Sequence, residues 1–110
     1  PYGSEGCVDT VCAAGSYYNP DLKDLYDKGV ANTGTLCSEL ESRGYKVESF
    51  TGYASKGDIL LYGDRDHAVI ADGAGGCFGN SSSNGYAMKY GDANYAWHNG
   101  EAPTEIIHMG

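Results

Sequence analysis

Residues 57–71 read GDILLYGDRDHAVIA, and this stretch decides the fold class. Residues 59–62 form a short apolar run of the kind found in buried strands. The turn-forming residues 63–66 follow, and residues 67–71 make a second, mostly apolar run of strand length. Two such runs joined by a short turn predict neighbouring strands of an antiparallel sheet.

Further strands are predicted on both sides of this pair. Residues 45–50 alternate between apolar and polar side chains, which indicates a half-buried strand with an imperfect end. Asp72 and Gly73 break the chain after the central pair, and residues 77–80 are expected to form the next strand. Residues 86–90 alternate again, and residues 106–107 are expected to end the sheet.

The first part of the chain instead has helical spacing. Apolar residues three and four apart predict helices over residues 7–15, 20–29 and 33–43, with Thr35 as an alternative start for the third. Asn19 is a helix-capping residue placed directly before a proline, and Gly44 stands where a glycine commonly ends a helix. Helices followed by a meander of strands predict an α+β fold, with the helices against one face of an antiparallel sheet.

The size and charge of the chain limit its functions. Its 110 residues fit one domain, residues 1–110, and the net charge is −8. An acidic chain has no electrostatic reason to bind nucleic acid or an anionic membrane, and no apolar stretch is long enough to cross one. Because the first residue is Pro1 rather than methionine, we expect the domain to be excised from a longer chain.

Four cysteines permit three disulfide pairings, which the sequence alone leaves open. They are Cys7, Cys12, Cys37 and Cys77. A structural zinc site needs closely paired ligands, but only Cys7 and Cys12 are close, and the three histidines are scattered. We therefore expect neither a metal nor another cofactor. Core packing is the favoured interpretation for Cys12, Cys37 and Cys77.

Cys7 is the candidate nucleophile. It follows Gly6 and is expected to open the first helix, where unpaired backbone N–H groups and the helix dipole favour the reactive thiolate. His67 is the candidate base; it should share a strand face with Val69 and Ala71, turned toward the helices. Asn80, near the end of the next strand, is the candidate group that orients the imidazole.

The alternative is that these residues have no catalytic role. A buried cysteine is often an inert packing residue, and a histidine among apolar neighbours is often a satisfied core residue. A Cys, His and Asn in this order also arise by chance in many chains of this length.

Three segments resemble the CHAP and NlpC/P60 families of cysteine peptidases. They are Gly6-Cys7-Val8-Asp9-Thr10-Val11, Gly57-Asp58-Ile59-Leu60-Leu61-Tyr62 and Asp66-His67-Ala68-Val69-Ile70. The first resembles the nucleophile segment, the second the glycine–aspartate strand and the third the histidine strand. Pro1-Tyr2 resembles a dipeptide that precedes the cysteine in NlpC/P60 proteins, which implies substrate binding by Tyr2. Asp9 occupies a position near which some CHAP enzymes bind calcium.

The resemblance implies a papain-like fold, with Cys7, His67 and Asn80 as catalytic residues. The implied activity is hydrolysis of amide bonds in peptidoglycan peptides, by an endopeptidase or an N-acetylmuramoyl-L-alanine amidase acting extracellularly on the bacterial wall. A negative domain would be repelled by anionic wall polymers, so we expect a wall-binding module elsewhere in the full-length chain. The alternative function is a non-catalytic Tyr- and Gly-rich module that binds cell-surface glycan or protein.

Overall fold

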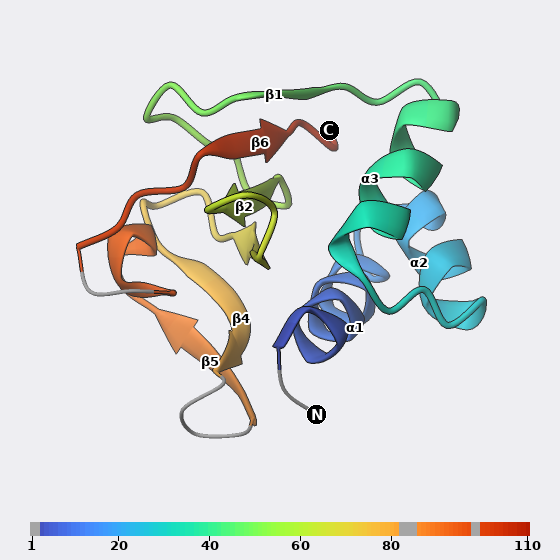
Figure 1. The fold of residues 1–110 in the computed structure, drawn as a ribbon, viewed down its shortest axis with the longest axis horizontal. Helices are drawn as coiled ribbons and strands as arrows, with labels where there is room; N and C mark the ends of the chain where they lie inside the picture. The colour runs from blue at the N-terminus through green and yellow to red at the C-terminus, as the bar shows by residue number, and fades with distance from the viewer. Residues whose placement is uncertain (1–2, 82–85, 98–99) are drawn as a thin grey trace.

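The computed structural model describes the backbone of residues 3–81, 86–97 and 100–110. It describes the side chains of the same residues except those of residues 3–5, 80–81 and 86–88. In the described part, three helices precede the strands along the chain, which is the predicted α+β fold (Figure 1).

The helices are α1 (Gly3–Gly15), α2 (Pro20–Asp27) and α3 (Thr33–Ser42). The side-chain oxygen of Asn19 caps α2, accepting hydrogen bonds from the backbone N–H groups of Asp21 and Leu22 at 2.8 and 3.2 Å. Asn32 caps α3 in the same way, through the N–H of Thr35 at 2.7 Å. These caps satisfy N–H groups that have no partner within the helix, so two asparagines set the starts of α2 and α3.

The strands form one six-stranded antiparallel sheet in the order β1-β6-β2-β3-β4-β5. Their bounds are β1 (Val47–Ser49), β2 (Ile59–Tyr62), β3 (His67–Ala71), β4 (Cys77–Ser81), β5 (Tyr86–Tyr90) and β6 (Glu105–Ile107). A short 3-10 helix, η1 (Ala93–Tyr95), lies between β5 and β6. The last strand, β6, inserts between β1 and β2, so it lies inside the sheet rather than at its edge.

Most predicted elements are confirmed within a few residues, and β2 and β3 match their predicted bounds. The start of the first helix is wrong: α1 begins at Gly3, so Cys7 is its fifth residue rather than its first. Gly44 has the positive φ of 96° that favours glycine after a helix end.

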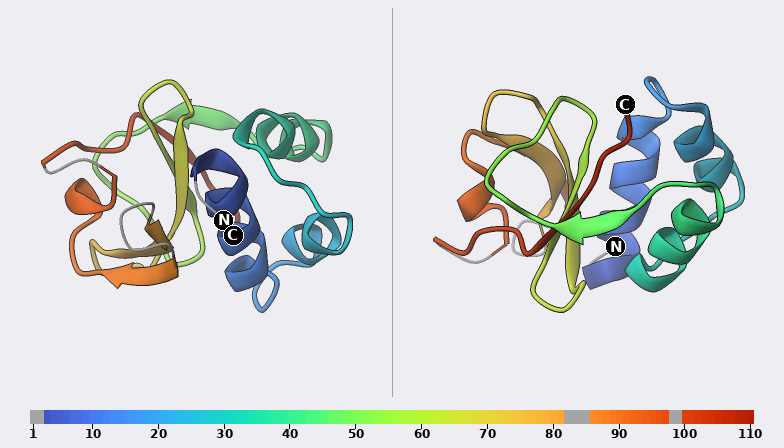
Figure 2. Two further views of the ribbon diagram at one scale, coloured as in Figure 1. Left: turned by 60° about the horizontal axis from the view of Figure 1, so that its bottom comes forward. Right: turned by 90° about the horizontal axis from the view of Figure 1, so that it is seen from above.

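The sheet separates two apolar clusters, and all three helices lie on one side of it (Figure 2). On the helix side, Val8 and Val11 of α1 pack with Leu61 and Ala68 of the central strands. On the other side, a second cluster forms under the loops and η1. Its buried members include Leu60, Tyr62, Val69, Ala71 and Cys77.

Asp58 fixes the end of the chain to the beginning of β2. Its carboxylate is 2% exposed and accepts hydrogen bonds from the backbone N–H groups of Ser55 and Met109, both at 3.0 Å. The Nδ1 atom of His108 also lies 3.0 Å from this carboxylate. A buried carboxylate needs such partners, so the aspartate of the glycine–aspartate motif has a structural role here.

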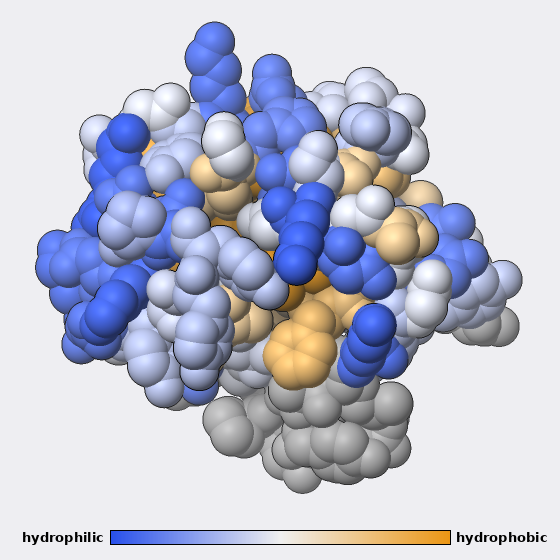
Figure 3. All heavy atoms as spheres, turned by 180° about the vertical axis from the view of Figure 1, so that it is seen from behind, coloured by the Kyte–Doolittle hydropathy of each residue, from blue (hydrophilic) through white to orange (hydrophobic). Residues whose placement is uncertain are grey.

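The surface seen from behind is mostly hydrophilic, with hydrophobic side chains gathered near its centre (Figure 3). None of the helices in the described part of the chain combines the length and apolarity needed to cross a lipid bilayer.

Gly15 allows α1 and α2 to approach closely. A Cβ atom at this position would overlap Cδ1 of Leu22, which is fully buried. We expect Gly15→Ala to lower the free energy of unfolding by about 1–3 kcal/mol, because the added methyl overpacks the contact. Denaturant unfolding followed by circular dichroism measures this change.

Gly34→Ala is the matched control, since a Cβ in this helical position has its nearest neighbour at 3.4 Å. Removing glycine from a helix stabilises it by up to about 1 kcal/mol. Equal destabilisation by the two substitutions would contradict the role given to Gly15.

Candidate functional site

Cys7 lies in the second turn of α1, on the face that packs against β3. Its side chain is fully buried and belongs to the same apolar cluster as Ala68. The backbone N–H of Ala68 is oriented to hydrogen-bond the sulfur of Cys7. The structure therefore brings the candidate nucleophile against the backbone of the residue that follows His67.

Burial decides the ionisation of this thiol. Desolvation raises the pKa of Cys7 above its ordinary value, and the backbone N–H groups of Ala68, Val8 and Cys7 itself oppose the rise without cancelling it. The predicted activation at the helix start is therefore wrong for the structure as it stands. The unpaired N–H groups of a helix belong to its first turn, and Cys7 lies beyond it.

His67 is the first residue of β3 and is 7% exposed. Its ring packs against that of Tyr62, its partner in the adjacent strand, with 5.6 Å between ring centroids. Tyr62 in turn contacts Trp97, at a centroid distance of 6.3 Å, and donates a hydrogen bond to the carbonyl of Ala93 at 2.7 Å. The imidazole of His67 therefore packs on the ring of Tyr62, which packs in turn against the ring of Trp97.

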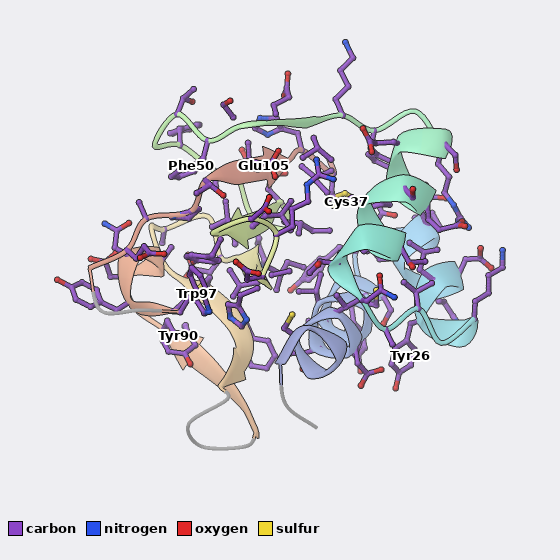
Figure 4. The ribbon with its side chains drawn as sticks, in the orientation of Figure 1. Tyr26, Cys37, Phe50, Tyr90, Trp97 and Glu105 are labelled. Atoms are coloured by element: carbon purple, nitrogen blue, oxygen red, sulfur yellow. The ribbon has the colours of Figure 1, made fainter. Side chains whose placement is uncertain are left out.

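The expected orientation of this strand face is wrong. Val69 and Ala71 belong to the cluster on the side of the sheet away from the helices, whereas Ala68 belongs to the cluster on the helix side. Successive strand residues point to opposite faces, so the face predicted to contact α1 is turned away from it. Tyr62, which pairs with His67 in the adjacent strand, contacts Trp97. Figure 4 shows Trp97 on the side of the strands away from the helices.

The remaining candidate residues are only partly placed. The backbone of Asn80 lies in β4 and pairs with Ala87 of β5, but its side chain lies outside the described part of the structure. Tyr2 lies entirely outside the described residues. The roles predicted for Asn80 and Tyr2 stay predictions.

No disulfide joins the four cysteines, all of which are described and buried. Burial, then the nearby carboxylate of Asp9, raises the pKa of Cys12 from 9.0 to about 12. Burial also raises the pKa of Cys77 from 9.0 to about 12, against a hydrogen bond with Tyr62 that lowers it. Core packing, the favoured interpretation of Cys12, Cys37 and Cys77, agrees with their complete burial.

Among the residues that the structure describes, no three His, Cys, Asp or Glu side chains are grouped so that they could hold a metal ion. One polar group of the site has no signal in the sequence: the backbone N–H of Ala68. Every residue except proline carries such a group, and only the packing of α1 on β3 brings this one to the thiol.

Comparisons with models of protein families, with curated proteins and with solved structures found no match to this chain.

The buried thiols predict a loss of stability at alkaline pH. A thiol whose pKa is raised by folding stabilises the folded state fully below its unfolded pKa, and this contribution is lost as the pH rises above it. For Cys12 and Cys77 the loss begins at about pH 9 and continues toward the folded pKa of about 12. It amounts to about 1.4 kcal/mol per pH unit for each thiol.

Denaturant unfolding of the reduced protein between about pH 8 and about pH 10.5 tests this dependence. The double variant Cys12→Ala, Cys77→Ala is the control: it should be less stable at neutral pH but lose less stability as the pH rises. Equal losses of stability in the variant and the parent would contradict the assignment of this pH dependence to Cys12 and Cys77.

Proposed function

We propose that this protein is a cysteine peptidase or amidase that hydrolyses amide bonds in peptidoglycan peptides. The observation that carries the proposal is the contact between the thiol of Cys7 and the backbone N–H of Ala68, the neighbour of His67. A nucleophile on a helix, set against a strand that begins with a histidine, is the arrangement that the resemblance to CHAP and NlpC/P60 proteins implies. A papain-like fold and an extracellular site of action are part of the same proposal.

In this mechanism Cys7 attacks the carbonyl carbon of the scissile amide, and His67 accepts the thiol proton. Because the His67 ring packs on Tyr62, on the side of the sheet away from α1, this transfer requires the ring to turn around the start of β3 toward Cys7. The backbone N–H of Ala68, which is oriented toward the sulfur, favours the thiolate, and in this proposal it donates to the oxyanion as the tetrahedral intermediate forms. His67 then protonates the amine as the carbon–nitrogen bond breaks, which leaves a thioester on Cys7. Water, deprotonated by His67, attacks the thioester and releases the carboxylic acid and the thiol.

The orienting group for His67 is proposed to be Asn80, in β4 next to β3. Tyr62 supports the imidazole from the neighbouring strand through its ring contact. Tyr62 is fully buried, and burial raises its pKa above the ordinary range, so it remains a neutral phenol that packs rather than a proton donor at neutral pH.

The complete burial of Cys7 adds a constraint on this chemistry. An amide carbonyl has to approach the sulfur to about 3–3.5 Å before reaction, so the chain over Cys7 has to open when substrate binds. Opening and the backbone donors then act together: opening removes part of the desolvation that favours the neutral thiol, and the donors favour the thiolate.

Hydrolysis of purified peptidoglycan, with products identified by mass spectrometry, tests the proposal. We expect Cys7→Ser and His67→Ala each to lower the rate by at least about 100-fold, because nucleophile and base are both part of the chemistry. Asn80→Ala should lower it less, because it affects only the orientation of the ring.

Cys37→Ala and His108→Gln are the matched controls. Both change the same residue types at positions away from β3, and both should retain activity once their folding has been checked. Turnover that survives in Cys7→Ser, or is lost equally in the two controls, would refute the proposed function.

A further inference from the structure

A second concave site lies on the other side of the sheet from the helices. It is a cavity of about 540 Å³ between the loop after β1, the loop after β3 and η1. Its floor includes Leu60 and Ala71, two buried residues of the cluster on that side. A cavity of this size is large enough for one or two sugar-sized rings.

Aromatic side chains form one wall of this cavity. Phe50 is partly buried against the cluster beneath it, and Figure 4 shows it on the side of the strands away from the helices. Tyr53, also in the wall, is 77% exposed. An amphipathic ring left in water beside a cavity offers a flat apolar surface with a polar tip, which suits stacking on the C–H face of a sugar.

The rim at η1 is polar, and the one charged group among its described residues is a carboxylate. Asp92 and Asn94 line it, and Asp92 caps η1 by accepting a hydrogen bond from the backbone N–H of Asn94 at 2.9 Å. Carboxylate and carboxamide oxygens accept hydrogen bonds from hydroxyl groups, and the carboxamide N–H donates to them. A ligand with several hydroxyl groups matches this rim.

Charge excludes the main competing ligands. No Lys, Arg or His is among the described residues that line the cavity, and the chain carries a net charge of −8. Phosphate, nucleic acid and anionic wall polymers are therefore repelled. Small apolar side chains, among them Ala93 and Pro103, also line it and offer an apolar surface to a methyl group such as that of an acetamido substituent.

We infer that this cavity is a binding subsite for a neutral N-acetylhexosamine-containing saccharide. The sugar ring stacks on Tyr53, its hydroxyl groups bond Asp92 and Asn94, and its acetamido methyl lies over the apolar floor. The subsite goes beyond the proposed hydrolysis and does not depend on the chemistry of Cys7.

The test is a nuclear magnetic resonance titration of the Cys7→Ser protein with the tetramer of N-acetylglucosamine. Using the Cys7→Ser protein separates binding from catalysis, so failure of the proposed hydrolysis leaves this result readable. Amide shifts are expected in the glycine-rich loop at Gly73, Gly75 and Gly76, all of which line the cavity. The glucose tetramer, which lacks acetamido groups, should bind more weakly.

Tyr53→Ala should weaken binding by about tenfold, equivalent to about 1.4 kcal/mol. Tyr17→Ala is the matched control, because Tyr17 is 88% exposed and lies outside this cavity. Both substitutions remove exposed rings, so both proteins should unfold at the parent temperature. Absence of shifts at millimolar saccharide, equal binding by the Tyr53→Ala protein, or preference for a trilysine peptide over the saccharide would overturn the proposal.

Discussion

Helix α1 lies against strand β3 with Cys7, Val8 and Val11 completely buried, and the remaining elements are arranged around this contact. The other two helices extend the same apolar layer, and Gly15 lets α2 approach closely through Leu22. The contact also determines the surroundings of the candidate nucleophile. It removes the thiol of Cys7 from water and at the same time supplies it with the backbone N–H of Ala68.

Burial and the backbone donor have opposite effects on the pKa of Cys7, and the proposed catalysis requires the thiolate. Desolvation stabilises the neutral thiol, whereas backbone donors stabilise the thiolate, and burial is the larger effect in this structure. A substrate that opens the cover of Cys7 while leaving the N–H of Ala68 in place would change that balance toward the reactive form. The proposed enzyme is therefore one whose nucleophile is held protonated until substrate binds.

The order of elements was readable from the sequence because each depends on local signals. Asn19 before a proline caps α2 where the sequence predicts it, and the apolar runs give β2 and β3 their predicted bounds. The start of α1 was not readable, because the glycine- and serine-containing segment before Cys7 has no apolar periodicity of its own. The face of β3 turned to α1 was not readable either: all five of its residues are buried, so alternation gives no signal.

The candidate site, too, could be predicted only in part from the sequence. Residue type and order pointed to Cys7 and His67, but the donor from Ala68 belongs to the backbone and the ring of Tyr62 comes from another strand. The cavity lined by Tyr53 and Asp92 joins loops far apart in the chain, which no local pattern reveals. Such features follow from tertiary packing alone.

The most direct measurement is to find which thiol is alkylated by a substrate-like electrophile. The protein would be mixed with a wall-type peptide carrying a vinyl sulfone in place of the scissile amide, digested, and mapped by mass spectrometry. Modification of Cys7, with Cys12, Cys37 and Cys77 unmodified in the folded protein, is the result expected for a nucleophile opened by substrate. Modification of another cysteine, or none in a preparation that hydrolyses wall peptides, would contradict the assignment of Cys7.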